Sequence, residues 1–451
     1  MTIRALILLT VIFAIPLPSH AELEPSTGTR IADFATIGGE IRPRFEYSSN
    51  FGGDRAAREE NEMVFMRTRA NVDIDVSDQV FARIEIQDFR RWGDPLSNAS
   101  GTTDAADLVL REGYLELTDL WSGRISTKLG RQAIVRGEER LLGDLDWHRI
   151  GRTHDAAVVS LRPGESHRMD FLFISVTEND NIGSTAAAKS GVDGDAFLWG
   201  MYGDIKWKPF TKFQPFWIYQ DYDSSTLPAL VPQVAGSGSS GSDFRVHTFG
   251  LLAGGEFLER WSWNAEGHYQ AGDFGVRKLS AYLAHGRLSY APGLTHLSRI
   301  STSYDIYSGD RNAADNTIQT YQPVFPSYYE HTGRIGRLGM KNLDRFRLAL
   351  SGAFLAGWQW RLDWHNFRSN SRADHLYATT GGVFLATGGA ASRSVGNEYD
   401  ASLSFPWKPN VTFTTTASVF HPGEASRQAV RNAGGAPGRT IDATAQVEVK
   451  F

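Results

Sequence analysis

Pairs of arginines spaced two residues apart occur near the start of the chain. Arg42 and Arg44 form one pair, Arg67 and Arg69 form a second, and Arg83 follows in the next polar segment. Side chains at positions i and i+2 of a β-strand lie on the same face. The spacing therefore predicts a wall of guanidinium groups, which bind carboxylates bidentately and favour anions in a narrow aqueous passage.

Further charged residues occupy the polar positions of later segments. The additional cations are Lys128, Arg299, Arg345, Arg347 and Arg361. The carboxylates on the same polar face are Glu40, Glu46, Asp73, Asp75, Glu85, Glu112, Glu116, Glu266, Asp305, Asp363, Glu398 and Asp400. Because opposite charges on neighbouring strands attract each other, either these residues pair and brace the wall, or they face a ligand, or the group does both.

Catalytic and metal-binding patterns are absent from the sequence. The chain has no Cys, which excludes disulfides and thiol nucleophiles. It contains neither a Gly-x-Ser-x-Gly elbow nor a His-Glu-x-x-His motif. His154 and Asp155 are adjacent and point to opposite faces of a strand, whereas Asp363 and His365 are expected to form a simple hydrogen bond. We therefore expect no enzyme, no metal and no cofactor.

Apolar and polar residues alternate along most of the chain, the pattern of strands with one apolar and one polar face. Eighteen such segments are predicted: 39–47, 63–76, 80–90, 109–118, 124–132, 154–162, 168–176, 197–207, 213–222, 245–253, 261–270, 279–290, 299–309, 344–352, 357–367, 398–407, 410–420 and 441–451. Beyond the N-terminus, no apolar run approaches the roughly 20 residues that a membrane helix needs.

The connections between these segments alternate in length. Residues 77–79 and 119–123 are short, whereas 91–108 and 133–153 are long. This pattern predicts an all-β fold: a single closed antiparallel transmembrane β-barrel of about 18 strands, with short periplasmic turns and long extracellular loops. A β-propeller would show a repeat of roughly 40–50 residues, which is not seen. A barrel of this size encloses an aqueous lumen, where Arg67 and Arg69 are expected near mid-height.

Both ends of the chain indicate the bacterial outer membrane. Residues 1–21 have a basic start, an apolar stretch and a Ser-His-Ala cleavage site, as in a signal peptide. Residues 22–451 then form the barrel, which ends on Phe451. Tryptophans predicted near the short turns form an interfacial girdle: Trp121, Trp207, Trp261, Trp358 and Trp407. The net charge of -5 is dispersed along the chain and argues against nucleic-acid binding.

Several short motifs occur in the middle and at the end of the chain. They are Lys128–Gln132, Gly137–Gly143 with Trp147, Gly151–Ala156, Gln322–Pro326 with Gly333, Gly336 and Asn342–Leu343, Gly396–Asp400 and Phe420–Glu424. Together they resemble the motif series of the alginate-export outer-membrane porin family. The resemblance implies an eighteen-stranded barrel with an arginine-rich, anion-selective bore, through which the polyuronate alginate leaves the periplasm.

The resemblance also implies particular residues near the conduit. They are Arg42, Arg67 or Arg69, Arg131, Arg152, and Arg334 or Arg337. Arg131 falls on the apolar phase of its predicted strand. Either the register slips at Gly130, as at a β-bulge, or Arg131 braces the rim instead of lining the bore.

Three long loops could constrict the lumen or stay outside it. Residues 133–153 and 310–343 are long enough to fold inward, whereas 223–244 contains a Gly/Ser run typical of a flexible extracellular loop. We expect a monomeric, passive channel for anionic saccharides, with polyuronate export as the first hypothesis and uptake of small carboxylates or sugars as the alternative. Its surroundings are outer-membrane lipid, and an export role would also involve periplasmic partners.

Overall fold

The structure is a computed structural model that describes residues 28–57, 59–92, 106–164, 166–177, 195–208, 210–222, 243–354 and 357–451. The predicted signal peptide, residues 1–21, lies outside this part, as do residues 223–242 of the predicted flexible loop. Among the described residues, no helix is long and apolar enough to cross a membrane.

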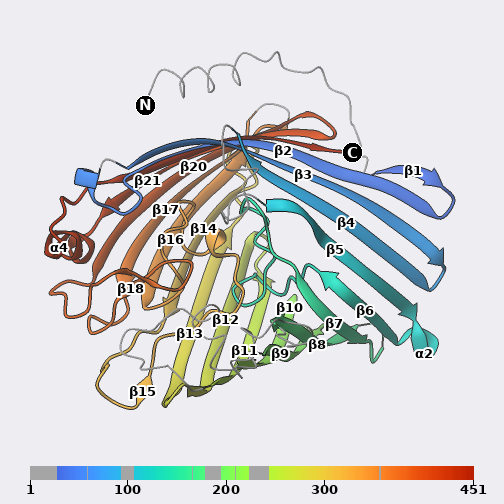
Figure 1. Cartoon of the computed structure of the whole chain (residues 1–451), viewed down its shortest axis with the longest axis horizontal. Coiled ribbons are helices and arrows are strands. Elements are labelled where there is room, and N and C mark those ends of the chain that lie inside the picture. The colour runs from blue at the N-terminus through green and yellow to red at the C-terminus, as the bar shows by residue number, and fades with distance from the viewer. Residues whose placement is uncertain are drawn as a thin grey trace, which may run out of the picture.

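Eighteen antiparallel strands form one closed β-barrel, as predicted (Figure 1). The strands are β2 (Ala35–Ser49), β3 (Glu60–Ser77), β4 (Val80–Arg91), β5 (Ala106–Asp119), β6 (Ile125–Gln132), β7 (His154–Leu161), β8 (His167–Thr177), β9 (Ala196–Ile205), β10 (Lys212–Tyr222), β11 (Phe244–Phe257), β12 (Trp261–Phe274), β13 (Arg277–Tyr290), β14 (Arg299–Tyr307), β16 (Leu343–Ala353), β17 (Gln359–Ser369), β20 (Ser394–Lys408), β21 (Val411–Pro422) and β22 (Thr440–Lys450). Each strand overlaps one of the predicted segments.

Short elements occur at the barrel ends and in the loops. They are β1 (Thr29–Ala32), β15 (Thr317–Ile318), β18 (Leu376–Tyr377), β19 (Val383–Leu385), the 3-10 turns η1 (Arg55–Ala57) and η2 (Tyr328–Glu330), the single turn α2 (Leu120–Gly123) and the helix α4 (Glu424–Asn432). Of these, β1 extends the sheet by pairing with β2, and β15 pairs with β13.

The first and last strands of the barrel close the sheet. β2 pairs with β22 in antiparallel fashion, with Glu40 opposite Lys450. Next to this ladder, Gly39 N donates to Phe451 O at 2.8 Å, and Phe451 N donates to Gly39 O at 3.1 Å. An open edge in hydrocarbon would leave N–H and C=O groups unpaired. Closure therefore lets a chain of moderate apolar content span the membrane.

Alternate side chains of the strands face the lipid and the lumen. On β17, Leu362 and Trp364 are 47% and 36% exposed, whereas Asp363 and His365 are buried. Tryptophans exposed around the short turns are Trp121, Trp207 and Trp407. This distribution matches a lipid-facing apolar band with an aromatic girdle at the periplasmic interface.

A β-bulge alters the inward face of β5. The register of β4 and β5 shifts between the pairs Glu85–Glu112 and Ile86–Leu110, so Arg111 has no direct counterpart on β4. A bulge re-aims side chains relative to the regular alternation. Arg111 and Glu112 are adjacent in sequence and both are buried, so the bulge adds a guanidinium group to the interior.

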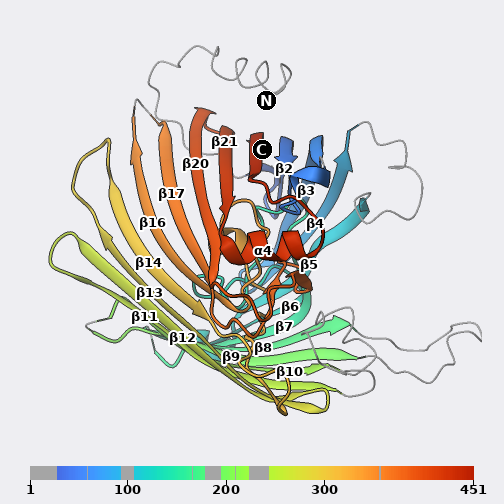
Figure 2. The same cartoon turned by 90° about the vertical axis from the view of Figure 1, so that its left-hand side faces the viewer.

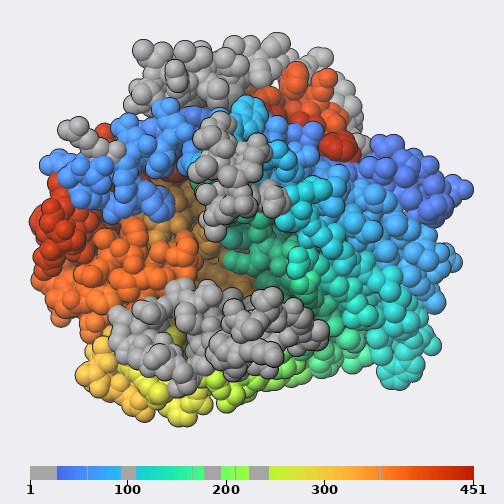
Figure 3. Space-filling model, viewed as in Figure 1, coloured from blue at the N-terminus to red at the C-terminus, as the bar shows by residue number. Residues whose placement is uncertain are grey.

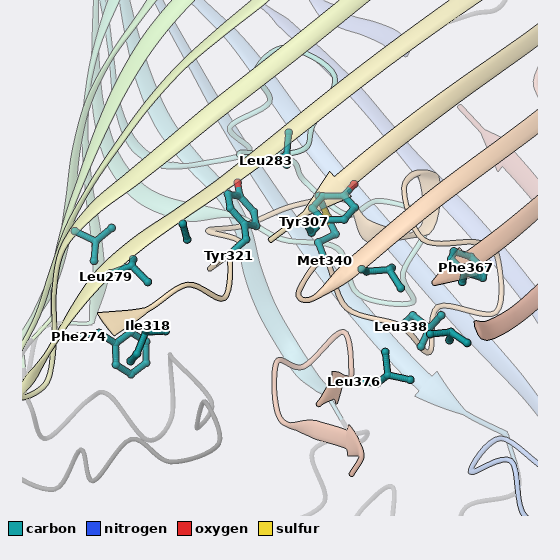
Figure 4. Packing of buried hydrophobic residues seen from close by; sticks show 14 of the residues in the cluster. Phe274, Leu279, Leu283, Tyr307, Ile318, Tyr321, Leu338, Met340, Phe367 and Leu376 are labelled. Atoms are coloured by element: carbon teal, nitrogen blue, oxygen red, sulfur yellow. The ribbon is translucent and has the colours of Figure 1, made fainter. Parts of the chain in front are cut away.

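Two long extracellular loops fold into the lumen: the β6–β7 loop (133–153) and the β14–β16 loop (308–342). Figure 2 shows loop segments inside the ring of strands. An apolar cluster fixes the second loop to the inner wall. Its members include Ile318, Tyr321, Leu338 and Met340 of the loop and Phe274, Leu279, Leu283, Tyr307 and Phe367 of the wall (Figure 4). The space-filling view still shows a hollow between blue N-terminal and orange C-terminal segments (Figure 3).

Candidate functional site

The β6–β7 loop is anchored to one wall by arginines around Asp146. The Asp146 carboxylate lies 3.1 Å from Arg67 Nη1 and 2.8 Å from Arg69 Nη1. Arg42 and Arg111 lie farther away, at 3.8 and 3.9 Å. Burial alone would raise the pKa of Asp146, but the charges of Arg67, Arg69 and Arg42 outweigh it and hold the pKa well below its usual range.

These wall residues make up the N-terminal cluster, which consists of the buried arginines Arg42, Arg44, Arg67, Arg69 and Arg111. Acceptors of the protein itself satisfy them. Arg67 donates two hydrogen bonds to Glu40, at 2.7 and 2.9 Å. Arg44 donates two to Gln446 Oε1, at 2.9 and 2.7 Å. The predicted basic wall thus exists, but its guanidinium groups are largely occupied.

Backbone and aromatic groups of the loop complete this anchorage. Arg42 donates to the His148 carbonyl at 3.0 Å, and Arg44 donates to the Trp147 carbonyl at 2.8 Å. The Trp147 ring also contacts two guanidinium groups, with its centroid 4.5 Å from Arg44 and 4.8 Å from Arg334. Such cation–π contacts add to the hydrogen bonds. The loop therefore sits firmly against β2 and β3.

The same loop reaches the opposite wall through Arg140. Its Nη1 donates to Glu266 of β12 at 2.8 Å, and its Nη2 lies 3.0 Å from His285 of β13. Its Nε donates to Asp305 of β14 at 3.4 Å. Burial by itself would lower the pKa of Arg140, but Glu266 and Asp305 raise it above its usual value, so the side chain stays charged. The loop therefore spans the lumen.

The β14–β16 loop packs onto the β6–β7 loop. Ser327 Oγ donates to Glu139 at 2.6 Å and accepts from Leu145 N at 3.0 Å. Gly143 N donates to Phe325 O at 2.8 Å. Because these contacts join the two loops to each other, they form one layer across the bore.

Two predicted lumen carboxylates hold this layer. Glu398 accepts from Ile335 N at 3.0 Å, and Asp400 accepts from Arg334 N at 3.5 Å. Glu398 is 0% exposed and Asp400 is 2% exposed. Both side chains point inward, and the loop that they support covers them.

A cavity of about 400 Å³ lies beneath the loops, beside the periplasmic halves of β13, β14, β16 and β17. Its charged lining residues, apart from histidines, are Glu138, Glu139, Arg140, Arg287, Arg299, Glu330, Arg345, Arg347 and Arg361. Six guanidinium groups therefore face three carboxylates. A neighbouring cavity shares Ser351 and Arg361 with it and continues to Ser404. We call the cationic space the periplasmic cavity.

Some arginines of the periplasmic cavity, Arg299 and Arg361 above all, are less fully satisfied than those of the N-terminal cluster. Arg347 and Arg361 share the carboxylate of Asp363, at 2.6 and 2.8 Å. The Arg361 side chain is 33% exposed. Arg299 is exposed and has no hydrogen bond or ion pair within the part of the chain that the structure describes. Donors on this wall are therefore available to a ligand.

Other predicted residues brace the wall. Arg83 donates to both oxygens of Asp73, at 2.6 and 2.7 Å, and Lys128 Nζ lies 3.6 Å from the Tyr114 ring centroid. Glu112 accepts a backbone hydrogen bond at 2.9 Å. These contacts agree with the expectation that some inward charged residues brace the wall and do not face a ligand.

Arg345 and Arg337 lie deeper in the interior. Arg345 lines the periplasmic cavity but is 1% exposed and donates two hydrogen bonds to Asp305, at 2.9 and 2.6 Å. Arg337 lies 4.8 Å from the Phe384 ring centroid and 4.7 Å from that of Phe420. It also donates to the Thr440 hydroxyl. Arg337 thus fixes its loop to the wall.

The structure corrects the placement of Arg131. Lys128 and Gln132 lie on the inward phase of β6, so Arg131 faces outward, where it donates to Asp155 at 2.8 and 2.6 Å. Its side chain is 42% exposed. Strand pairing is regular across Gly130. Of the two alternatives, Arg131 therefore braces the outer face.

Three residues of the anchorage were not predicted from the sequence: Arg111, Arg140 and Asp146. Arg111 lies at a bulge, where the alternation that assigns faces breaks down; it donates to Glu85 at 2.8 Å. Arg140 and Asp146 lie in a loop, where no periodicity indicates direction. The motif from Gly137 to Trp147, which contains both, was the available signal.

Together, the closed eighteen-stranded barrel, its short turns on one rim and its cationic interior define a passive outer-membrane channel. The chain belongs to the alginate export family, whose model matches residues 33–437. No curated protein sequence matches it.

Solved outer-membrane porins share the fold. OpdQ of Pseudomonas aeruginosa is 10% identical, with a TM-score of 0.57, over 93% of this chain and 99% of that one. OpdK of the same species, solved with vanillate, is 12% identical, with a TM-score of 0.56, over 92% and 98% of the chains. A BenF-like porin from Pseudomonas fluorescens Pf-5 is 10% identical, with a TM-score of 0.56, over 93% and 99%. At such identities the likeness establishes the fold alone.

Proposed function

We propose that the channel conducts anionic saccharides and that its cargo is an alginate-like polyuronate leaving the periplasm. The periplasmic cavity carries this proposal, because two arginines of its lining remain accessible: Arg299 is exposed and has no partner among the described residues, and the Arg361 side chain is 33% exposed. Cationic side chains lower the barrier for a polyanion that loses hydration, while several weak sites let it leave again. Membership of the alginate export family supports a carboxylated sugar as the cargo.

In this proposal the arginines divide into two groups. Arg299, Arg347 and Arg361 contact the cargo, because their donors border the cavity. The N-terminal cluster instead holds the β6–β7 loop in the lumen. Since the two loops form a layer across the bore, passage of a polymer requires some of their contacts to loosen.

The test is single-channel recording of the purified protein in planar bilayers. We expect an anion-selective reversal potential in a salt gradient, and block by oligomannuronate but not by neutral maltooligosaccharides. The double variant Arg299→Ala/Arg361→Ala is expected to weaken both effects. Arg245→Ala is the matched control, because Arg245 lies on the outward phase of β11 and is exposed. Cation selectivity or indifference to oligomannuronate would refute the proposal.

A second candidate function is uptake of small carboxylates or sugars. It is favoured by the loop layer, which narrows the lumen, and by a further cavity of only about 270 Å³ on its extracellular side. The structural relative OpdK was solved with vanillate. Under this alternative, liposomes containing the protein admit small carboxylates at rates that oligomannuronate does not reduce.

A further inference from the structure

A second cavity, of about 270 Å³, lies by the extracellular ends of β10 and β11 and contacts both inward loops. Its side-chain lining includes Arg152, Lys341, Gln220, Gln322, Tyr222, Phe244, Phe325 and Tyr328. It shares no lining residue with the periplasmic cavity. Its volume lies just below the roughly 300–1,000 Å³ of pockets for drug-sized ligands, so it suits a single ring. We call it the extracellular cavity.

Lys341 is a buried cation of this cavity whose Nζ lies 5.5 Å from the Tyr377 ring centroid and has no hydrogen-bond partner among the described residues. It is 3% exposed, and its Nζ makes no ion pair with these residues either. The carboxylate of Asp374 exerts a favourable charge effect, but it already accepts from Tyr377 Oη at 2.6 Å and Asp310 N at 2.9 Å. Burial lowers the pKa of Lys341 to about 8, and a bound anion would favour its charged form.

Arg152 provides the second cation. Its Nη1 donates to the carbonyls of Gly143 and Pro326, at 3.2 and 3.3 Å. Its Nε and Nη2 donate to none of the described residues, and no described carboxylate lies within ion-pair distance. Burial lowers the pKa of Arg152 to about 10, so it remains charged at neutral pH. Two donor groups of one guanidinium are therefore free for a carboxylate.

Two amide oxygens add unpaired acceptors. Gln220 Oε1 and Gln322 Oε1 are buried and lack a partner among the described residues. Gln322 Nε2 donates to the Thr320 carbonyl at 2.8 Å, and this fixes the amide orientation because a carbonyl can only accept. Leaving a buried acceptor unsatisfied is costly. Hydroxyl groups of a sugar would satisfy both oxygens.

We propose that the extracellular cavity binds a single uronate ring. Its carboxylate would lie between Arg152 and Lys341, its hydroxyls would donate to Gln220 and Gln322, and its apolar face would contact the aromatic lining. The inference rests on the proposed function for the class of cargo and deepens it, because it adds a second binding site beyond the loop layer.

The experiment is saturation-transfer NMR of the folded protein in detergent, with D-mannuronate and D-mannose as probes. D-mannuronate is expected to bind and D-mannose is not. Lys341→Met should weaken D-mannuronate binding about tenfold or more, as expected when a charged hydrogen bond is lost, whereas Lys341→Arg should retain it. Arg245→Ala is the control, because Arg245 is exposed on the outward phase of β11 and lines neither cavity, and it should leave this binding unchanged.

Equal binding of the two sugars, or unchanged affinity in Lys341→Met, would overturn the inference. Heat-modifiable mobility on gels reports whether each variant is folded. If Lys341→Met does not fold, Gln322→Glu replaces it, because a carboxylate at this position repels the ligand; unchanged affinity there also overturns the site. If D-mannuronate fails to bind while oligomannuronate still blocks conductance, this site is refuted and the proposed function stands.

Discussion

The N-terminal cluster and the periplasmic cavity use the same residue type in different surroundings. In the N-terminal cluster, Arg67 is 1% exposed and is bonded to Glu40 and Asp146. In the periplasmic cavity, Arg361 shares a carboxylate with another arginine, and Arg299 has no partner in the described part of the chain. Inward direction alone therefore does not mark an arginine as a contact for cargo. The arginine must also have N–H donors that no protein acceptor occupies.

The difference follows from the energetics of buried charge. Removing a guanidinium from water is costly unless acceptors surround it, and once they do, the group holds structure in place. A partly exposed guanidinium has a smaller desolvation penalty, and it exchanges bound water for a passing carboxylate more easily. Loop anchorage and anion binding can thus occur in one barrel without competing for the same side chains.

The largest effect is expected from Arg67→Ala. The substitution removes the bidentate partner of buried Glu40 and one of the two arginines closest to Asp146. Breaking a buried ion pair in this way costs about 3–5 kcal/mol. We expect lower resistance to urea in liposomes and a larger single-channel conductance, because the β6–β7 loop loosens. Unchanged conductance together with wild-type stability would show that the cluster does not anchor the loop.

Asp146→Asn should have an intermediate effect, with a noisier open channel at neutral pH. The pKa of Asp146 is lower in the folded protein than the roughly 3.9 of an aspartate in an unfolded chain. Its ion pairs therefore stabilise the docked loop fully above about pH 3.9, and this stabilisation is lost as the pH falls through the pKa of the folded state. Wild-type conductance should therefore be constant from neutral pH to about pH 4.5. A wild-type channel that opens between these values would contradict the role given to Asp146.

The smallest effect is expected from Arg131→Ala, the matched control for Arg67→Ala. Both arginines donate bidentately to a carboxylate, but Arg131 and Asp155 are exposed on the outer face, one residue from the extracellular ends of β6 and β7 and therefore near the aqueous rim. Exposed ion pairs contribute about 1 kcal/mol or less. Selectivity and conductance should match the wild type. A large loss of selectivity would restore Arg131 to the bore.

The positions of the strands and the direction of their side chains were predictable, because apolar and polar residues alternate with a period of two along each strand. The alternation in β17 assigns Asp363 to the lumen and Trp364 to the lipid, as observed. Side-chain direction at Arg131 also followed from its apolar phase, although the family resemblance pointed to the bore. Physical periodicity was the better guide there.

The loop layer was not predictable, because its anchors come from residues far apart in sequence. Nothing near Asp146 in the chain reveals that Arg67 and Arg69 surround it, and no periodicity directs Arg140 toward Glu266. The inward direction of Arg111 was not predicted, for a local reason. A single inserted residue in β5 reverses the alternation of inward and outward side chains from which faces are assigned. Predicting which arginines stay free requires knowledge of the acceptors that the loops bring in.

The anchors of the β6–β7 loop also set an order of assembly. Arg67 precedes Asp146 by 79 residues, whereas Asp305 follows Arg140 by 165. Contacts this distant carry a large loop-closure entropy until the intervening chain is ordered, so we expect the loop to dock after strands from both halves stand in the wall. We therefore expect a barrel whose strands have paired but whose β6–β7 loop has not yet docked to conduct more than the mature channel.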